Sequence, residues 1–100
     1  MLGGCLMRLI DFNLSTADLT PSMPLFWETS AHQLVPIKAV QLQQQQLVLI
    51  PQAGATPLTL NQLNARTRQL SGPTQLYVKT PDTIELLFGY RLNQARLLFG

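Results

Sequence analysis

The feature that most constrains the fold of this 100-residue chain is a similarity between its two halves. A shift of 51 positions places residues 9–29 on residues 60–80 without a gap, and six of the 21 positions are identical. The identical pairs are Leu9 and Leu60, Asn13 and Asn64, Thr16 and Thr67, Leu19 and Leu70, Leu25 and Leu76, and Thr29 and Thr80. Internal similarity of this kind indicates a repeated supersecondary unit, the alternative being coincidence in a leucine-rich chain. We therefore expect two copies of one unit, over residues 8–51 and 58–100.

The length of the repeated unit limits how it can fold. A unit of about 43 residues is close to the size below which a chain rarely buries enough surface to fold alone. We therefore expect a single domain over residues 1–100, in which each unit completes the hydrophobic core of the other. Pro51, Gly54 and Pro57 predict a linker over residues 51–57 between the two units.

Each unit is expected to open with a helix. The residues Leu60, Leu63, Thr67 and Leu70 recur at helical spacing, and Thr59 and Gln62 have the spacing of a capping box. A Gly-Pro pair follows, so this helix is predicted over residues 60–71. The matching helix of the first half is predicted over residues 9–19, with an extended conformation of residues 6–14 as the alternative.

Alternating apolar and polar residues predict three strands after each helix. The expected strands cover residues 25–29, 34–42, 46–50, 75–80, 84–92 and 95–99. Each unit then has one apolar helix face and one apolar sheet face to bury. The sequence therefore predicts an α+β fold: a duplicated α-β-β-β unit forming an antiparallel six-stranded sheet, with two helices packed on one face.

Side chains that carry catalysis or bind metals are few. His32 is the only histidine and is expected in a solvated turn, and Cys5 is the only cysteine. They supply no metal-binding spacing, and the glycines form no phosphate-binding motif. Asp11 and Asp18 are two helical turns apart but are expected on the surface rather than as a catalytic pair. We expect a non-catalytic protein, not an enzyme, with no cofactor and no metal.

Three large side chains are candidates for a partner-binding surface. Alternation turns Phe26 away from the core if Trp27 faces it, and Tyr77 takes the matching position in the second half. Leu87 lies opposite the main apolar face of its predicted strand. Charged residues make up only 12% of the chain, so self-repulsion is weak. We predict that Phe26, Tyr77 and Leu87 form an exposed patch on the sheet that binds another protein or a second copy, giving a homo-oligomer. If helices cover both faces of the sheet, these residues are core instead.

The alternative function is nucleic-acid binding by the basic second half. Residues 1–51 carry a net charge of −1 and residues 52–100 a net charge of +3. An uneven distribution of this kind is typical of chains with an anionic partner. The basic side chains of the second half are Arg66, Arg68, Lys79, Arg91 and Arg96.

The single cysteine and the hydropathy pattern bear on the compartment. One cysteine permits no disulfide within the chain, which fits a reducing compartment. No window reaches the roughly 18 consecutive apolar residues that a membrane span needs. We expect a cytoplasmic protein that does not enter a membrane.

Two strand segments resemble those of a known group of proteins. Residues 23–29 (MPLFWET) and 36–40 (PIKAV) follow a leucine-spaced helix. In this they resemble small uncharacterised proteins of Gram-positive, lactic-acid-type bacteria and their mobile elements. The resemblance implies a bacterial protein and carries over no functional residue.

Overall fold

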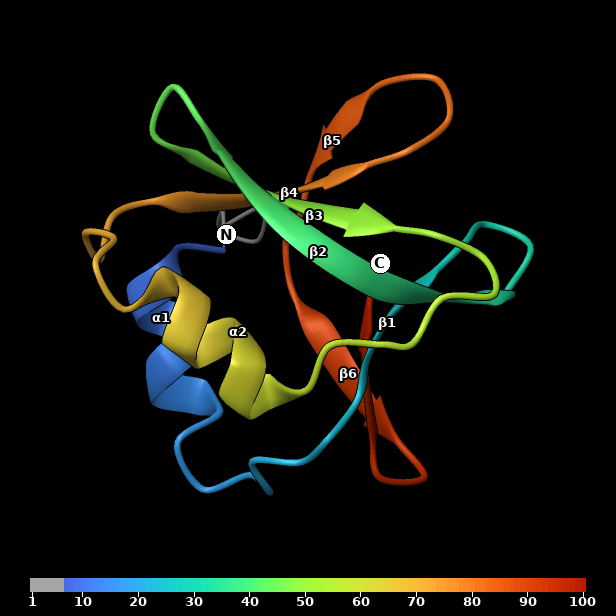
Figure 1. The fold of residues 1–100 in the computed structure, drawn as a ribbon, viewed down its shortest axis with the longest axis horizontal. Helices are drawn as coiled ribbons and strands as arrows, with labels where there is room; N and C mark the ends of the chain where they lie inside the picture. Colours follow the sequence, from blue (N-terminus) through green and yellow to red (C-terminus); the bar gives the residue numbers. More distant parts are fainter. Residues whose placement is uncertain (1–6) are drawn as a thin grey trace, which may run out of the picture.

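The computed structural model describes residues 7–100, so Cys5 lies outside the described residues. The fold is α+β, with helices α1 (Leu9–Ser15) and α2 (Leu60–Thr67). The strands are β1 (Leu25–Glu28), β2 (Leu34–Gln43), β3 (Gln46–Pro51), β4 (Gln75–Lys79), β5 (Ile84–Leu86), β6 (Tyr90–Asn93) and β7 (Arg96–Phe99). The two helices lie next to each other on one side of a curled sheet (Figure 1).

The sheet has seven strands in the order β5-β4-β3-β2-β1-β7-β6. Pairing is antiparallel within each half, but β3 pairs with β4 and β1 pairs with β7 in parallel. The prediction of six antiparallel strands is therefore wrong. The physical reason is that α2 forms the crossover between β3 and β4, and a crossover helix returns the chain to run in the same direction.

The strand predicted over residues 84–92 is broken, which changes the direction of its side chains. It forms β5 and β6, separated by residues 87–89. In β2, the register of pairing with β3 shifts between Ile37 and Ala39. Ile37 and Leu87 both lie in the core at these bends. The prediction that Leu87 is exposed is wrong, since only 4% of its surface is accessible.

Each helix begins against the chain of the other half. The amide of Leu9 donates to the carbonyl of Thr74 at 2.7 Å, and the amide of Leu60 donates to the carbonyl of Met23 at 2.9 Å. The two donors are 51 positions apart in the sequence, and so are the two acceptors. The next residue of each helix repeats this relation. The amide of Ile10 donates to the carbonyl of Gly72 at 3.0 Å, and the amide of Asn61 donates to the carbonyl of Pro21 at 2.8 Å. The first turn of α1 is thus held by the second half, and that of α2 by the first half.

The two helices start and end differently from each other. At α2 the predicted capping box is present: Gln62 N donates to Thr59 Oγ1 at 3.2 Å, and Thr59 N donates to Gln62 Oε1 at 3.0 Å. Arg8, at the start of α1, provides no side-chain cap and pairs with Asp11 instead. α2 ends at Thr67 rather than residue 71, because the chain turns there, with Leu70 N donating to Thr67 O.

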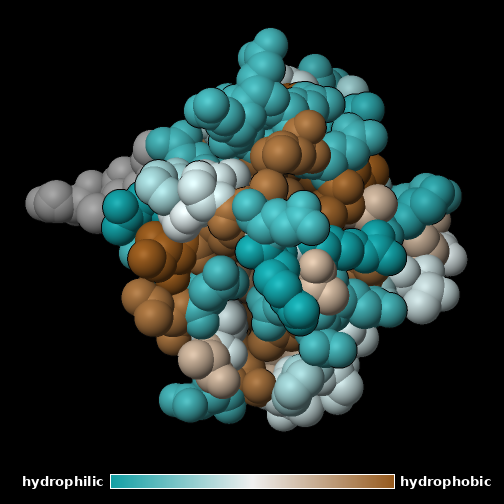
Figure 2. Space-filling view, turned by 60° about the vertical axis from the view of Figure 1, so that its left-hand side comes forward, coloured by the Kyte–Doolittle hydropathy of each residue, from teal (hydrophilic) through white to brown (hydrophobic). Residues whose placement is uncertain are grey.

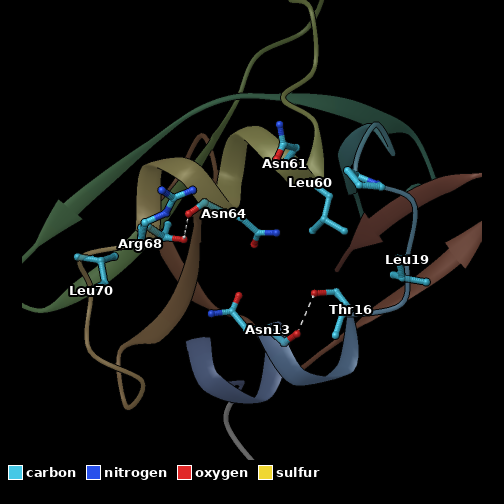
Figure 3. A pocket seen from close by; sticks show the side chains of 11 residues that line it. Asn13, Thr16, Leu19, Leu60, Asn61, Asn64, Arg68 and Leu70 are labelled. Atoms are coloured by element: carbon cyan, nitrogen blue, oxygen red, sulfur yellow. Dashed lines mark hydrogen bonds between the residues drawn. The ribbon is translucent and has the colours of Figure 1, made fainter.

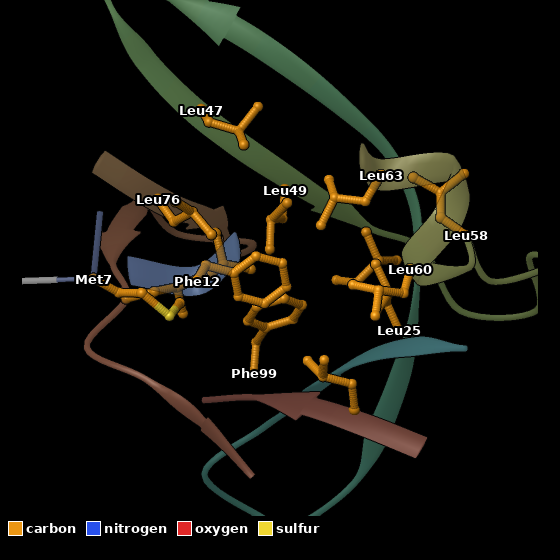
Figure 4. Close-up of a cluster of buried hydrophobic side chains, with 14 of the residues drawn as sticks. Met7, Phe12, Leu25, Leu47, Leu49, Leu58, Leu60, Leu63, Leu76 and Phe99 are labelled. Carbon is orange, nitrogen blue, oxygen red and sulfur yellow. The ribbon is translucent and has the colours of Figure 1, made fainter. Parts of the chain in front are cut away.

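One hydrophobic core takes side chains from both halves (Figure 4). The rings of Phe12 and Phe99 lie at its centre, with centroids 5.6 Å apart. The buried hydroxyls of Thr16 and Thr67 donate to the carbonyls four residues earlier, at 2.8 and 2.9 Å. A buried hydroxyl with a partner avoids the desolvation penalty of an orphaned group. Neither half encloses this core without the other.

Candidate functional site

The three side chains of the predicted patch do not come together. Phe26 lies on β1 and Tyr77 on β4, and β3 and β2 separate these strands in the sheet. Both are half-buried: the guanidinium of Arg96 lies 5.9 Å from the Phe26 ring, and the Tyr77 hydroxyl donates to Gln75 at 2.9 Å. Since Leu87 is in the core, the patch of Phe26, Tyr77 and Leu87 does not exist as one surface.

The basic residues of the second half are also distributed over several elements. Arg66 and Arg68 lie on α2 and at its end, and Lys79 lies at the end of β4. Only Arg91 and Arg96 lie on neighbouring strands, β6 and β7. Arg91 is engaged by a carboxylate, as described below. These five side chains therefore do not form one continuous basic surface.

A cleft of about 840 Å³ lies between the β1–β2 loop and the β4–β5 loop. Both loops lie on the right-hand side of Figure 1, away from the helices. Trp27 and Phe88 supply aromatic surface to this cleft, and Glu28, Asp82 and Glu85 supply carboxylates. We call it the loop cleft. The sequence did not predict the loop cleft, because the residues of its two walls are far apart along the chain.

In each of the two loops that border the cleft, a threonine hydroxyl accepts from two backbone amides, with different spacing in the two loops. Thr29 Oγ1 accepts from the amides of Ala31 (3.2 Å) and Gln33 (3.1 Å). Thr80 Oγ1 accepts from the amides of Asp82 (3.3 Å) and Thr83 (3.0 Å). A threonine side chain that bonds to the next backbone amides fixes a tight loop. The identity of the residues at positions 29 and 80 was the one sequence signal that pointed to both loops.

Glu28 is the best-anchored carboxylate of the loop cleft. Its side chain is 15% exposed, and Arg91 donates to it from Nε (3.0 Å) and Nη2 (2.6 Å). His32 Nδ1 lies 3.4 Å from Oε2. The Arg91 hydrogen bonds hold the pKa of Glu28 below its usual value, against the opposing effect of burial and with further help from His32. The same pair raises the pKa of Arg91. Glu28 is thus an ionised link between β1 and β6.

This ion pair predicts a pH dependence of stability. A carboxyl whose folded-state pKa is lowered contributes stability above its unfolded pKa and loses it as the pH falls through the folded value. We expect the urea midpoint of the wild type to fall more steeply from about pH 5 to about pH 3 than that of Glu28→Gln. The pKa of Asp11 is also lowered, by Arg8, but that pair is present in both proteins. Parallel pH profiles would show that the Glu28–Arg91 pair does not link folding to pH.

A second hollow, of about 380 Å³, lies between the two helices (Figure 3). Its lining includes Asn13 of α1, Thr16 just after α1, Asn64 and Thr67 of α2, and Arg68 just after α2. We call it the interhelical groove. Two pairs of residues that are identical between the halves, Asn13 with Asn64 and Thr16 with Thr67, thus line the same groove. Their positions in the sequence did not indicate this.

The helix side of the molecule also carries exposed apolar side chains. Figure 2 shows hydrophobic side chains scattered among hydrophilic ones on this side. Leu14 of α1 is 71% exposed, and Phe88, which lines the loop cleft, is 62% exposed. Leu14 lines neither the loop cleft nor the interhelical groove, so it serves as the control position for Phe88 in tests of the loop cleft.

His32 lies in the β1–β2 loop and is exposed, as expected for a solvated turn. Residues 7–100 contain no group of three His, Cys, Asp or Glu side chains placed to hold a metal ion. None of the helices in this part of the chain is long and apolar enough to cross a membrane. No protein family, curated protein or solved structure matches the chain.

Proposed function

We propose that the chain is a non-catalytic interaction module that holds a segment of a partner protein in the loop cleft. The observation that supports this most is that Asp82 and Glu85 border one cleft together with Trp27 and Phe88, beside Glu28, which is already paired with Arg91. Ammonium and guanidinium groups pair with carboxylates and lie over aromatic rings. A segment that carries lysine or arginine would therefore fit the cleft and cover the exposed ring of Phe88.

The bound segment belongs to another protein or to a second copy of the chain. Arg66 is exposed on α2, away from the loop cleft, so a second copy can present it to the cleft. Nucleic-acid binding is the less favoured proposal. Its candidate residues are dispersed, and the charge of Arg91 is already engaged by Glu28.

Selection from a random-peptide display library against the full chain tests the proposal. We expect enriched peptides to carry lysine or arginine. Phe88→Ser should weaken their binding at least about tenfold, because it removes the exposed aromatic contact. Leu14→Ser removes a similarly exposed apolar side chain outside the cleft and should leave binding unchanged.

Failure to enrich any binder, or a loss of binding on Leu14→Ser rather than Phe88→Ser, would refute the proposal. Sedimentation velocity of the chain alone then identifies the source of the segment. Concentration-dependent dimers that disappear with Phe88→Ser indicate a second copy. A monomer that still binds enriched peptides indicates another protein.

We also infer that residues 8–51 and 58–100 arose by duplication of one α-β-β-β unit. The parallel pairings support this: Leu47 lies opposite Leu76, and Leu97 lies opposite Leu25. Leu25 and Leu76 are 51 positions apart in the sequence, and Leu47 and Leu97 are 50 positions apart. The matched hydrogen bonds at the helix starts support the same inference. The two walls of the loop cleft would then be two copies of one loop.

A further inference from the structure

The interhelical groove carries a polar pattern that folding does not explain. Thr16 and Thr67 have a structural role, since their hydroxyls donate to carbonyls of their own helices. Asn13 and Asn64 contribute backbone carbonyls that lie 3.5 Å from these hydroxyls. Their side-chain amides point into the groove from opposite walls (Figure 3). Asparagine is a weak helix former, and the side chains of Asn13 and Asn64 are exposed, so packing of the core does not account for them.

The chemistry of the lining selects a class of ligand. Among residues 7–100, Arg68 is the only charged residue that lines the groove, and no aromatic side chain of these residues lines it. This favours an anion over a cation or a stacked ring. A guanidinium matches a carboxylate in a two-bond geometry, and a carboxamide both donates and accepts, as a peptide group does. The volume of about 380 Å³ is that of a small ligand site.

We propose that the interhelical groove binds a carboxylate next to an amide bond, the chemistry shared by a peptide C-terminus and an N-acylated amino acid. Arg68 binds the carboxylate, and Asn13 and Asn64 bind the adjoining amide from the two walls. This site lies between the helices and does not depend on the loop cleft.

The test is an NMR titration of the full chain with N-acetylglycylglycine, its C-terminal amide and acetate. We expect N-acetylglycylglycine to cause saturable shifts of the side-chain amide signals of Asn13 and Asn64. Its C-terminal amide and acetate should cause none. Arg68→Gln should weaken binding at least about tenfold, the value of a charge-assisted hydrogen-bond pair. Arg66→Gln removes the same charge from the same helix but lies outside the groove, and should change the affinity less than twofold.

Three results would overturn the proposal: no saturable shift of either asparagine, equal weakening by Arg66→Gln and Arg68→Gln, or equal binding of acetate and N-acetylglycylglycine. The source of the ligand follows from chain length. Tighter binding of longer N-acetylated glycine peptides supports a peptide terminus. Equal binding of N-acetylglycine and the longer peptides supports a small N-acylated amino acid.

Discussion

Replacement of Phe99 by alanine is expected to lower the free energy of unfolding by about 3–5 kcal/mol. The Phe99 side chain is fully buried, and its ring lies against that of Phe12 at the centre of the core. Its strand pairs with β1 on one side and β6 on the other. Loss of the ring leaves a cavity that fixed strands cannot close. The expected loss is a large part of the about 5–15 kcal/mol that stabilises a typical domain.

Phe88→Ala is the matched control, because it removes the same side chain from an exposed position. Its effect on the free energy of unfolding should stay within about 0.5 kcal/mol. Urea unfolding followed by far-UV circular dichroism measures both variants under one condition. Equal losses in the two variants would mean that Phe99 is not at the centre of the core.

The helices and most strands could be predicted because their signals are local. The capping box of Thr59 and Gln62 acts within four residues and fixed the start of α2, whereas the Gly-Pro pair at residues 72–73 placed its end four residues too late. Alternation gave β1, β3, β4 and β7 within one or two residues of their ends. These signals depend on the chain's own backbone and need no knowledge of tertiary contacts.

The direction of pairing and the position of Leu87 could not be predicted in this way. Parallel pairing of β3 with β4 depends on where α2 returns the chain, which no local pattern encodes. A bend in a strand shifts the alternation by one residue and moves the next side chain to the other face. The break between β5 and β6 turns the side chain of Leu87 into the core in this way.

The candidate sites were harder to predict than the fold. The loop cleft needs the loops after β1 and β4 side by side, and Glu28 and Arg91 are brought together across 63 positions. Nothing in the local sequence of Glu28 distinguishes it from a solvated carboxylate. The identities at positions 13 and 64 and at positions 29 and 80 marked both hollows, but only the fold shows that they face each other.

Neither half of the chain is expected to fold alone. Residues 1–51 lack the carbonyls of Gly72 and Thr74 on which α1 begins. Residues 52–100 lack the carbonyls of Pro21 and Met23 on which α2 begins, and they lack β1, which pairs with β7. Each separate half should therefore show no cooperative unfolding transition. Mixed in equal amounts, the halves should restore the parallel pairings and the shared core, since each supplies the surface that the other lacks.

The most direct test of the shared core is an amide NMR spectrum of each half alone and of the equimolar mixture. We predict poorly dispersed spectra for the separate halves. In the mixture, the Leu25 and Leu76 amide signals should appear at their positions in the intact chain. A well-dispersed spectrum with cooperative melting from either half alone would contradict a core that needs both, and with it the two-walled loop cleft.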